Sequence, residues 1–112
     1  IDPKRIYLTG VSMGARGVWN AATSYPDLFT ALAPISGFSY YLKAAKIAKV
    51  PTWIFHGKSD NVVPFEESYK MFSSMKEAGG NPRFSTWEGG HSGFHKVYDT
   101  EDLYLWMLEH TK

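Results

Sequence analysis

The residues with the clearest chemical potential stand near the start of the chain, in the pentapeptide GVSMG at residues 10–14. An apolar, β-type run at residues 5–9 precedes it, and a helix-like segment rich in small residues follows at 13–24. This G-x-S-x-G pattern is typical of a sharp strand-to-helix turn that presents a serine as a nucleophile. Glycine relieves the crowding and the unusual backbone angles of such a turn. The pattern therefore predicts that Ser12 is a covalent nucleophile for acyl transfer.

Two further residues supply the partners that a serine nucleophile needs. A serine hydroxyl is a poor nucleophile until a base removes its proton. His91, in the loop after a β-type run at 83–87, could be that base and return the proton to the leaving group. Asp60, in the loop after a β-type run at 52–55, could hold the imidazole in the useful tautomer. The backbone N–H of Met13, at the start of the following helix, could donate to the oxyanion.

Strand-like and helix-like segments alternate along the chain, which is the pattern of a parallel α/β sheet. We expect one domain over residues 1–112, with a parallel sheet of about four strands and flanking helices. Ser12, Asp60 and His91 then all follow the carboxyl ends of strands, where sites in such sheets form. The predicted strands are 5–9, 31–35, 52–55 and 83–87, the predicted helices are 13–24, 65–78 and 100–109, and 38–50 is a connector with a short helix over 42–48.

Two of the predicted helices carry apolar faces that should contact the sheet. The helix at 65–78 places four large side chains at spacings of three and four residues, and hence on one face: Phe65, Tyr69, Phe72 and Met75. The C-terminal helix turns a second apolar group toward the core: Leu103, Trp106, Met107 and Leu108.

Composition narrows the function classes. The net charge is +1, so there is no electrostatic case for nucleic acid or an anionic membrane as partner. The absence of cysteine excludes disulfides and thiolate catalysis. His and carboxylate residues show no metal-ligand spacing, and we expect no metal and no cofactor. The chain starts without Met, so we expect a processed or excised piece; the compartment stays open.

The combined motifs resemble the C-terminal half of an α/β hydrolase of the esterase, dienelactone hydrolase and predicted-peptidase branch. The matching stretches cover nearly the whole chain: 6–14, 25–29, 33–37, 55–64 and 89–91. The chain order Ser12, Asp60, His91 is the order of the triad in that superfamily. The resemblance implies a serine hydrolase that cleaves small carboxylic esters through an acyl-serine intermediate. A peptidase remains an alternative that rests on family analogy alone.

The resemblance also indicates what these 112 residues do not contain. In that fold several strands precede the nucleophile strand, and a loop after one of them gives the second oxyanion N–H. Losing one such donor costs about 100- to 1,000-fold in turnover, so the alternative is a catalytically weak fragment or assembly module. The strand at 5–9 would also be a bare apolar edge, which invites pairing with another chain. We therefore expect self-association, most simply as a homodimer.

Each predicted site residue has a competing explanation. Ser12 could be an ordinary serine in a glycine-rich turn, Asp60 could shape its turn or cap the helix near residue 64, and His91 could be a surface histidine. The other candidates are Asp99 and Asp102 as acids and His95 as base, with His56 expected to be structural and His110 suited to a helix C-terminus.

Several aromatic side chains near the predicted site are candidates for substrate contact: Phe38, Tyr40, Tyr41 and Trp87. Aromatic residues more often fill cores, because they bury a large apolar area. The connector at 38–50 is too short for a large lid, which favours short, accessible esters.

Overall fold

Four parallel strands form a single sheet in the computed structural model, which describes residues 2–112. The strands are β1 (Tyr7–Val11), β2 (Ala31–Ile35), β3 (Trp53–Gly57) and β4 (Arg83–Trp87), and they lie side by side in the order β1-β2-β3-β4. The predicted α/β fold is confirmed. The first strand lies two residues later than predicted, because Gly10 and Val11 still pair with Pro34 and Ile35 of β2.

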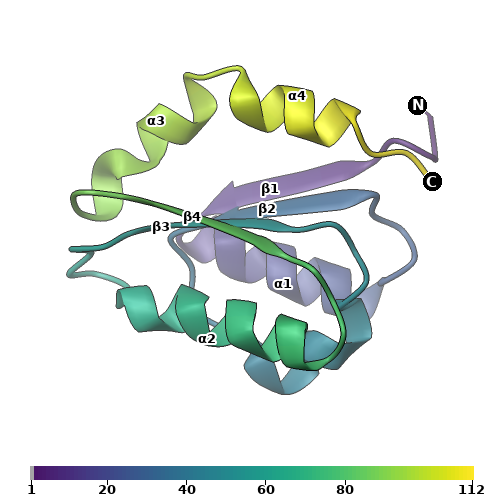
Figure 1. The fold of residues 1–112 in the computed structure, drawn as a ribbon, viewed down its shortest axis with the longest axis horizontal. Helices are drawn as coiled ribbons and strands as arrows, with labels where there is room; N and C mark the ends of the chain where they lie inside the picture. Colours follow the sequence, from purple (N-terminus) through teal and green to yellow (C-terminus); the bar gives the residue numbers. More distant parts are fainter. Residues whose placement is uncertain (1) are drawn as a thin grey trace.

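Helices cover both faces of the sheet (Figure 1). One face carries α1 (Met13–Ser24), the 3₁₀ helix η1 (Tyr41–Ile47) and α2 (Phe65–Glu77). Crossovers between parallel strands are nearly always right-handed. With four strands in sequential order, that handedness puts all three crossovers on the same face. The chain after β4 covers the other face with η2 (His91–Phe94), α3 (His95–Tyr98) and α4 (Asp102–Leu108).

The sheet separates two apolar cores. The first joins α1, η1 and α2 to the sheet through nine buried side chains: Val18, Trp19, Ala22, Leu32, Ala44, Ile47, Ile54, Met71 and Met75. The second joins α3 and α4 to the sheet through Ala33, Ile35, Trp53, Phe55, Val97, Leu103 and Met107. The central strands β2 and β3 are buried throughout, as expected for parallel strands with both faces covered.

The ladder between β2 and β3 has a gap at Pro34. Leu32 N–H donates to Pro51 O and Ser36 N–H donates to Phe55 O, each over 2.9 Å. The donor between them would be residue 34, and proline has no N–H. The two strands are therefore paired on either side of the proline.

Two predicted helix faces are only partly correct. On α2, Met71 and Met75 are fully buried, whereas Tyr69 is 55% exposed. The α2 rings instead pack around Phe84 of β4, with centroid distances of 5.5 Å for Phe65 and 5.4 Å for Phe72. The aromatic row thus covers the edge strand, and the methionines one turn away fill the core. On α4, Leu108 is exposed.

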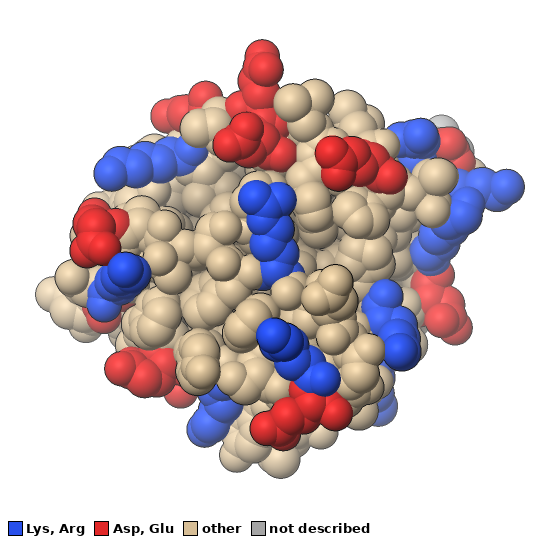
Figure 2. Space-filling model, in the orientation of Figure 1, with Lys and Arg blue, Asp and Glu red and all other residues tan. Residues whose placement is uncertain are grey.

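Charged side chains are spread over the surface without a continuous patch of one sign on the face seen in Figure 2. No helix among residues 2–112 has the length and apolar character needed to cross a membrane. The two ends of the chain lie together beyond the amino ends of the strands (Figure 1), where Lys112 N–H donates to Lys4 O over 3.0 Å.

Candidate active site

Ser12 occupies a sharp turn between β1 and α1. Its backbone has φ 59° and ψ −112°, a combination that costs a non-glycine residue of order 1–3 kcal/mol. Its N–H still donates to Ile35 O over 2.9 Å, as part of the sheet, while its carbonyl accepts the N–H groups of Ala15 and Arg16. One residue therefore ends the strand and starts the helix, and the surrounding hydrogen bonds hold it in the strained conformation.

The two glycines of the pentapeptide have different roles. A Cβ on Gly10 would lie 2.4 Å from the carbonyl oxygen of Gly14, which is backbone and cannot move aside. A Cβ on Gly14 would meet nothing within 4 Å. The close approach of β1 to α1 therefore requires glycine at position 10 only.

Asp60 and His91 are in direct contact. Asp60 Oδ2 lies 2.7 Å from His91 Nδ1, and the Asp60 side chain is fully buried while that of His91 is 21% exposed. The other carboxylate oxygen accepts the N–H groups of Val62 and Val63, each over 2.9 Å. The carboxylate thus fixes the imidazole through Nδ1, which leaves Nε2 for a proton from another group.

A second histidine, His56, supports the same carboxylate. It is fully buried, with Nε2 2.8 Å from Val63 O and 3.3 Å from Asp60 Oδ2. Because both of these neighbours are acceptors, we assign the proton to Nε2, and Nδ1 then accepts from the Ser68 hydroxyl at 2.6 Å. His56 is structural, as predicted, but its link to Asp60 was not predicted.

Burial raises the pKa of Asp60, but the hydrogen bonds from His91, Val63 and Val62, together with the charge of protonated His91, outweigh burial and hold that pKa below its usual value. Asp60 is therefore ionised at neutral pH. An ionised acceptor at Nδ1 stabilises the imidazolium that forms when a histidine takes a proton at Nε2.

The chain after β4 returns across the sheet toward β1. Tyr98 OH of α3 lies 2.8 Å from Thr9 Oγ1, and Phe94 and Val11 pack at the margin of the same core. Two strands, β2 and β3, lie between β4 and β1, and the Tyr98–Thr9 contact shows that the segment after His91 returns to the strand that leads into Ser12. Among the hydrogen bonds of residues 2–112, none joins Ser12 to His91, and such catalytic contacts often tighten only when substrate binds.

Met13 opens α1 and its side chain is 89% exposed. The first N–H groups of a helix have no partner within it, and the recorded donors to Ser12 O are Ala15 and Arg16. Met13 N–H is thus one of the N–H groups at the positive end of α1, directly after Ser12.

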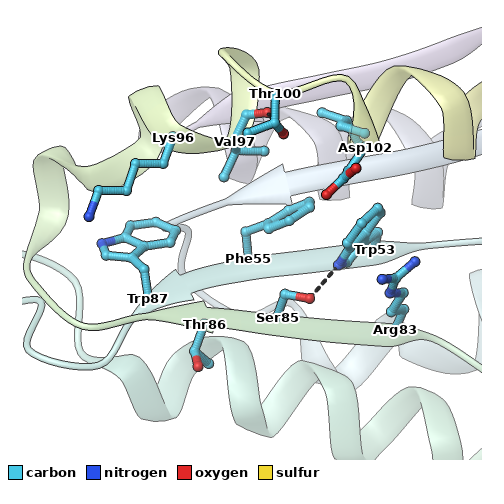
Figure 3. Close-up of a pocket in the computed structure, with 11 residues that line it drawn as sticks. Trp53, Phe55, Arg83, Ser85, Thr86, Trp87, Lys96, Val97, Thr100 and Asp102 are labelled. Atoms are coloured by element: carbon cyan, nitrogen blue, oxygen red, sulfur yellow. Dashed lines mark hydrogen bonds between the residues drawn. The ribbon is translucent and has the colours of Figure 1, made fainter.

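The aromatic residues predicted to contact substrate lie in two places. Tyr40 lines a cavity of about 270 Å³ beside Arg16, one helical turn after Ser12, and the Arg16 guanidinium lies over its ring at 5.1 Å. Phe38, which precedes this cavity, is 44% exposed. Trp87 instead lines a separate cavity of about 300 Å³ between β3, β4 and the α3–α4 face (Figure 3).

A second serine with a strained backbone lies directly after β2, next to the Ser12 turn. Ser36 has φ 56°, is fully buried, and its hydroxyl has no hydrogen-bond partner within the described part of the chain. A Cβ on the next residue, Gly37, would come within 2.5 Å of Ala15 Cβ. This turn therefore packs directly against the first turn of α1.

The competing acids and bases lie outside this constellation. Asp99, Asp102 and His95 are exposed, and His95 packs against Phe94 at a ring distance of 4.2 Å. His110 Nδ1 donates to Trp106 O over 2.8 Å near the end of α4. Within residues 2–112, no group of three or more His, Asp or Glu side chains is arranged to hold a metal ion.

Comparison with known proteins gives a consistent result for family and fold. Residues 1–104 match the dienelactone hydrolase family. The crystal structure of a thermostable esterase superposes with a TM-score of 0.94 at 35% identity and covers 100% of this chain. The acylaminoacyl peptidase of Pyrococcus horikoshii superposes with a TM-score of 0.80 over 96% of this chain, and at 20% identity it shows the fold alone.

Sequence relatives are much longer than this chain. Poly(3-hydroxyalkanoate) depolymerase C of Paucimonas lemoignei is 35% identical over 92 residues, which cover 80% of this chain but 21% of that protein. The chain likewise spans 32% of the thermostable esterase and 24% of the peptidase.

The geometry of the turn between β1 and α1 predicts opposite effects on stability for two glycine substitutions. Gly10→Ala should lower the free energy of unfolding by about 1–3 kcal/mol, because the new Cβ overlaps Gly14 backbone. Gly17 lies within α1, with open space around it. Gly17→Ala should therefore raise the free energy of unfolding by about 0.5–1 kcal/mol. Urea unfolding followed by circular dichroism measures both, and a neutral Gly10→Ala would contradict the steric argument.

The lowered pKa of Asp60 predicts a pH-dependent difference between the wild type and Asp60→Asn. The folded-state pKa lies below the unfolded one, so the ionised group stabilises the fold above the unfolded value of about 4 and loses this effect as pH falls through the folded pKa. Urea unfolding of both proteins, measured at about five pH values between pH 7 and pH 2, gives the difference in their free energies of unfolding. This difference should become smaller toward acid pH. Asp99→Asn, at an exposed position, is the control and should show little gap at neutral pH.

Proposed function

The chain belongs to the dienelactone hydrolase family, and from that premise we propose that it is a serine hydrolase that cleaves small carboxylic esters. The observation that carries the proposal is the placement of three elements at one end of the sheet: the strained Ser12 turn, the 2.7 Å Asp60–His91 contact, and the 91–98 segment that returns to β1. The esterase superposition at 35% identity supports ester chemistry.

The proposed reaction assigns one task to each residue. Ser12 Oγ attacks the ester carbonyl while His91 Nε2 takes the hydroxyl proton, and the N–H of Met13 donates to the oxyanion. The alcohol then leaves with the proton from His91, and an acyl-serine remains. Water attacks the acyl group with His91 again as base, which releases the carboxylic acid and restores the Ser12 hydroxyl. Asp60 stays ionised throughout and stabilises the imidazolium.

The surroundings of Ser12 favour short substrates. Met13 is largely exposed and Phe38 is 44% exposed, so the entrance is open. We propose Phe38 and Tyr40 as substrate contacts, since both follow the carboxyl end of β2 and Tyr40 lines the cavity that includes Arg16. The connector between β2 and β3 forms η1 and packs against the core through Ala44 and Ile47. This connector therefore does not form a lid.

The alternative is a catalytically weak fragment or assembly module. Met13 gives one oxyanion donor, and the second donor of related folds comes from a loop before the nucleophile strand. Residues 2–112 contain no strand before β1. The two functions differ in a measurable quantity, which is turnover that depends on Ser12.

Hydrolysis of p-nitrophenyl acetate by the wild type and by Ser12→Ala is the direct test. We expect the variant to fall to the background rate, a loss of about 10³-fold or more if the whole set of residues works as a unit. Ser24→Ala, at the exposed far end of α1, should retain the wild-type rate. Equal, near-background rates for all three proteins would favour the weak-fragment alternative. A panel of short chromogenic peptides, left uncleaved while the ester is cleaved, would remove the peptidase alternative.

We also propose that the chain self-associates through β1. Within residues 2–112 this strand is at the end of the sheet order and pairs with β2 alone, so its other edge offers backbone donors and acceptors for a further strand. A second copy is the simplest occupant, because a two-fold axis lets two such edges meet.

Light scattering coupled to size exclusion tests the association at micromolar concentration. We expect a mass of two chains, each of 12.6 kDa. A clean single-chain mass at every concentration would contradict the proposal. If the dimer forms, ester turnover per chain measured across its dissociation shows whether the partner copy contributes to the site.

A further inference from the structure

A tryptophan at the end of β4 closes the turn that presents His91. The indole Nε1–H of Trp87 donates to Gly90 O over 2.9 Å, and Gly90 is the residue from which η2 begins, with His91 as its first residue. The same carbonyl accepts the N–H of Gly93 over 3.3 Å. The indole therefore fixes the peptide unit directly before the imidazole.

Glycines let both site loops approach this indole. A Cβ on Gly93 would lie 2.0 Å from Trp87 Nε1, and a Cβ on Gly57, at the start of the Asp60 loop, would lie 2.7 Å from the same atom. Gly89 has φ 141°, a conformation that side chains rarely adopt. Positions 57 and 93 lie so close to the indole nitrogen that neither can carry a side chain.

Hydrogen bonds join the two loops around the ring. Lys58 N–H donates to Trp87 O over 3.0 Å, and Ser59 N–H donates to Gly89 O over 2.9 Å. The loop that carries Asp60 is thus tied by two backbone hydrogen bonds to the segment that runs from Trp87 to His91. The ring itself lines the cavity shared with Lys96 and Phe55 (Figure 3).

We propose that Trp87 is a positioning residue for the candidate catalytic histidine. Its indole N–H holds Gly90, and through Gly90 it holds the His91 ring where Nδ1 meets Asp60, which leaves Nε2 for a proton from another group. This inference rests on the proposed function for its consequence in catalysis, and on the hydrogen-bond geometry for its structural part. It gives Trp87 a role other than the substrate contact predicted from sequence.

Two matched substitutions test the proposal. Trp87→Phe keeps an aromatic ring and removes the N–H. Trp53→Phe removes an indole donor from the same cavity, where Trp53 Nε1 donates to Ser85 Oγ over 2.8 Å, away from both loops. We expect kcat for p-nitrophenyl acetate to fall about 10- to 100-fold in Trp87→Phe, with KM within about twofold, because small misplacements of a catalytic group are costly. We expect kcat within about twofold of wild type in Trp53→Phe.

A second readout does not depend on turnover. The His91 ring proton on Nδ1, bonded to Asp60, is identified in ¹H–¹⁵N spectra by its loss in His91→Gln. In Trp87→Phe this signal should broaden or vanish, and in Trp53→Phe it should persist. An unchanged signal and an unchanged kcat in a folded Trp87→Phe would overturn the positioning role.

The two readouts also separate failure of this inference from failure of the proposed function. If wild type and Ser12→Ala hydrolyse the ester equally, the hydrolase proposal fails, and the Nδ1 proton alone decides whether Trp87 positions His91. If Trp87→Phe does not fold, Gly93→Ala replaces it, since its Cβ would displace the indole nitrogen. Loss of the Nδ1 signal in folded Gly93→Ala supports the role, and a retained signal overturns it.

Discussion

The arrangement of the site depends on one buried carboxylate. A charge removed from water is costly unless hydrogen bonds and an opposite charge replace the lost hydration. Asp60 obtains these from two backbone N–H groups of its own loop, from His91 and, at longer range, from His56. These donors come from three pieces of structure, so satisfying the carboxylate also fixes the loop after β3, the end of β3 itself and the turn after β4. The same requirement explains why His56, which has no direct task in the proposed reaction, is fully buried next to the candidate site.

Much of this architecture could be predicted from the sequence, and the reasons are local. Apolar runs followed by glycine-containing turns marked all four strands, and the motif at residues 10–14 marked the elbow at Ser12. Ser12, Asp60 and His91 each follow a predicted parallel strand, which placed all three polar groups at one end of the sheet. The contact between Asp60 and His91 agrees with that placement. The bounds of two strands moved: β1 extends to Val11, because Gly10 and Val11 still pair with β2, and β3 extends to Gly57 because His56 and Gly57 still pair with β4.

The parts that sequence reasoning missed depend on contacts between distant residues. Nothing in the local pattern at 91–98 indicates that the segment returns to β1, since its position comes from Tyr98 meeting Thr9 across the sheet. The link from His56 to Asp60 depends on a turn that brings residues 56, 60 and 63 together. The rotation of α2, which buries Met71 and moves the aromatic row onto Phe84, follows from the partner that each face finds. A period of 3.6 residues identifies a face but not its partner.

The meeting of the two chain ends has a mechanical consequence. Lys4 accepts a hydrogen bond from Lys112, Tyr7 donates to His110 O over 2.7 Å, and Arg5 donates to Leu108 O over 3.0 Å. These bonds lie at the amino ends of the strands, whereas Ser12, Asp60 and His91 follow the carboxyl ends (Figure 1). A tension applied between the termini is therefore borne first by the short bridge from β1 to the end of α4. The site lies off that load path and keeps its geometry until the bridge has parted.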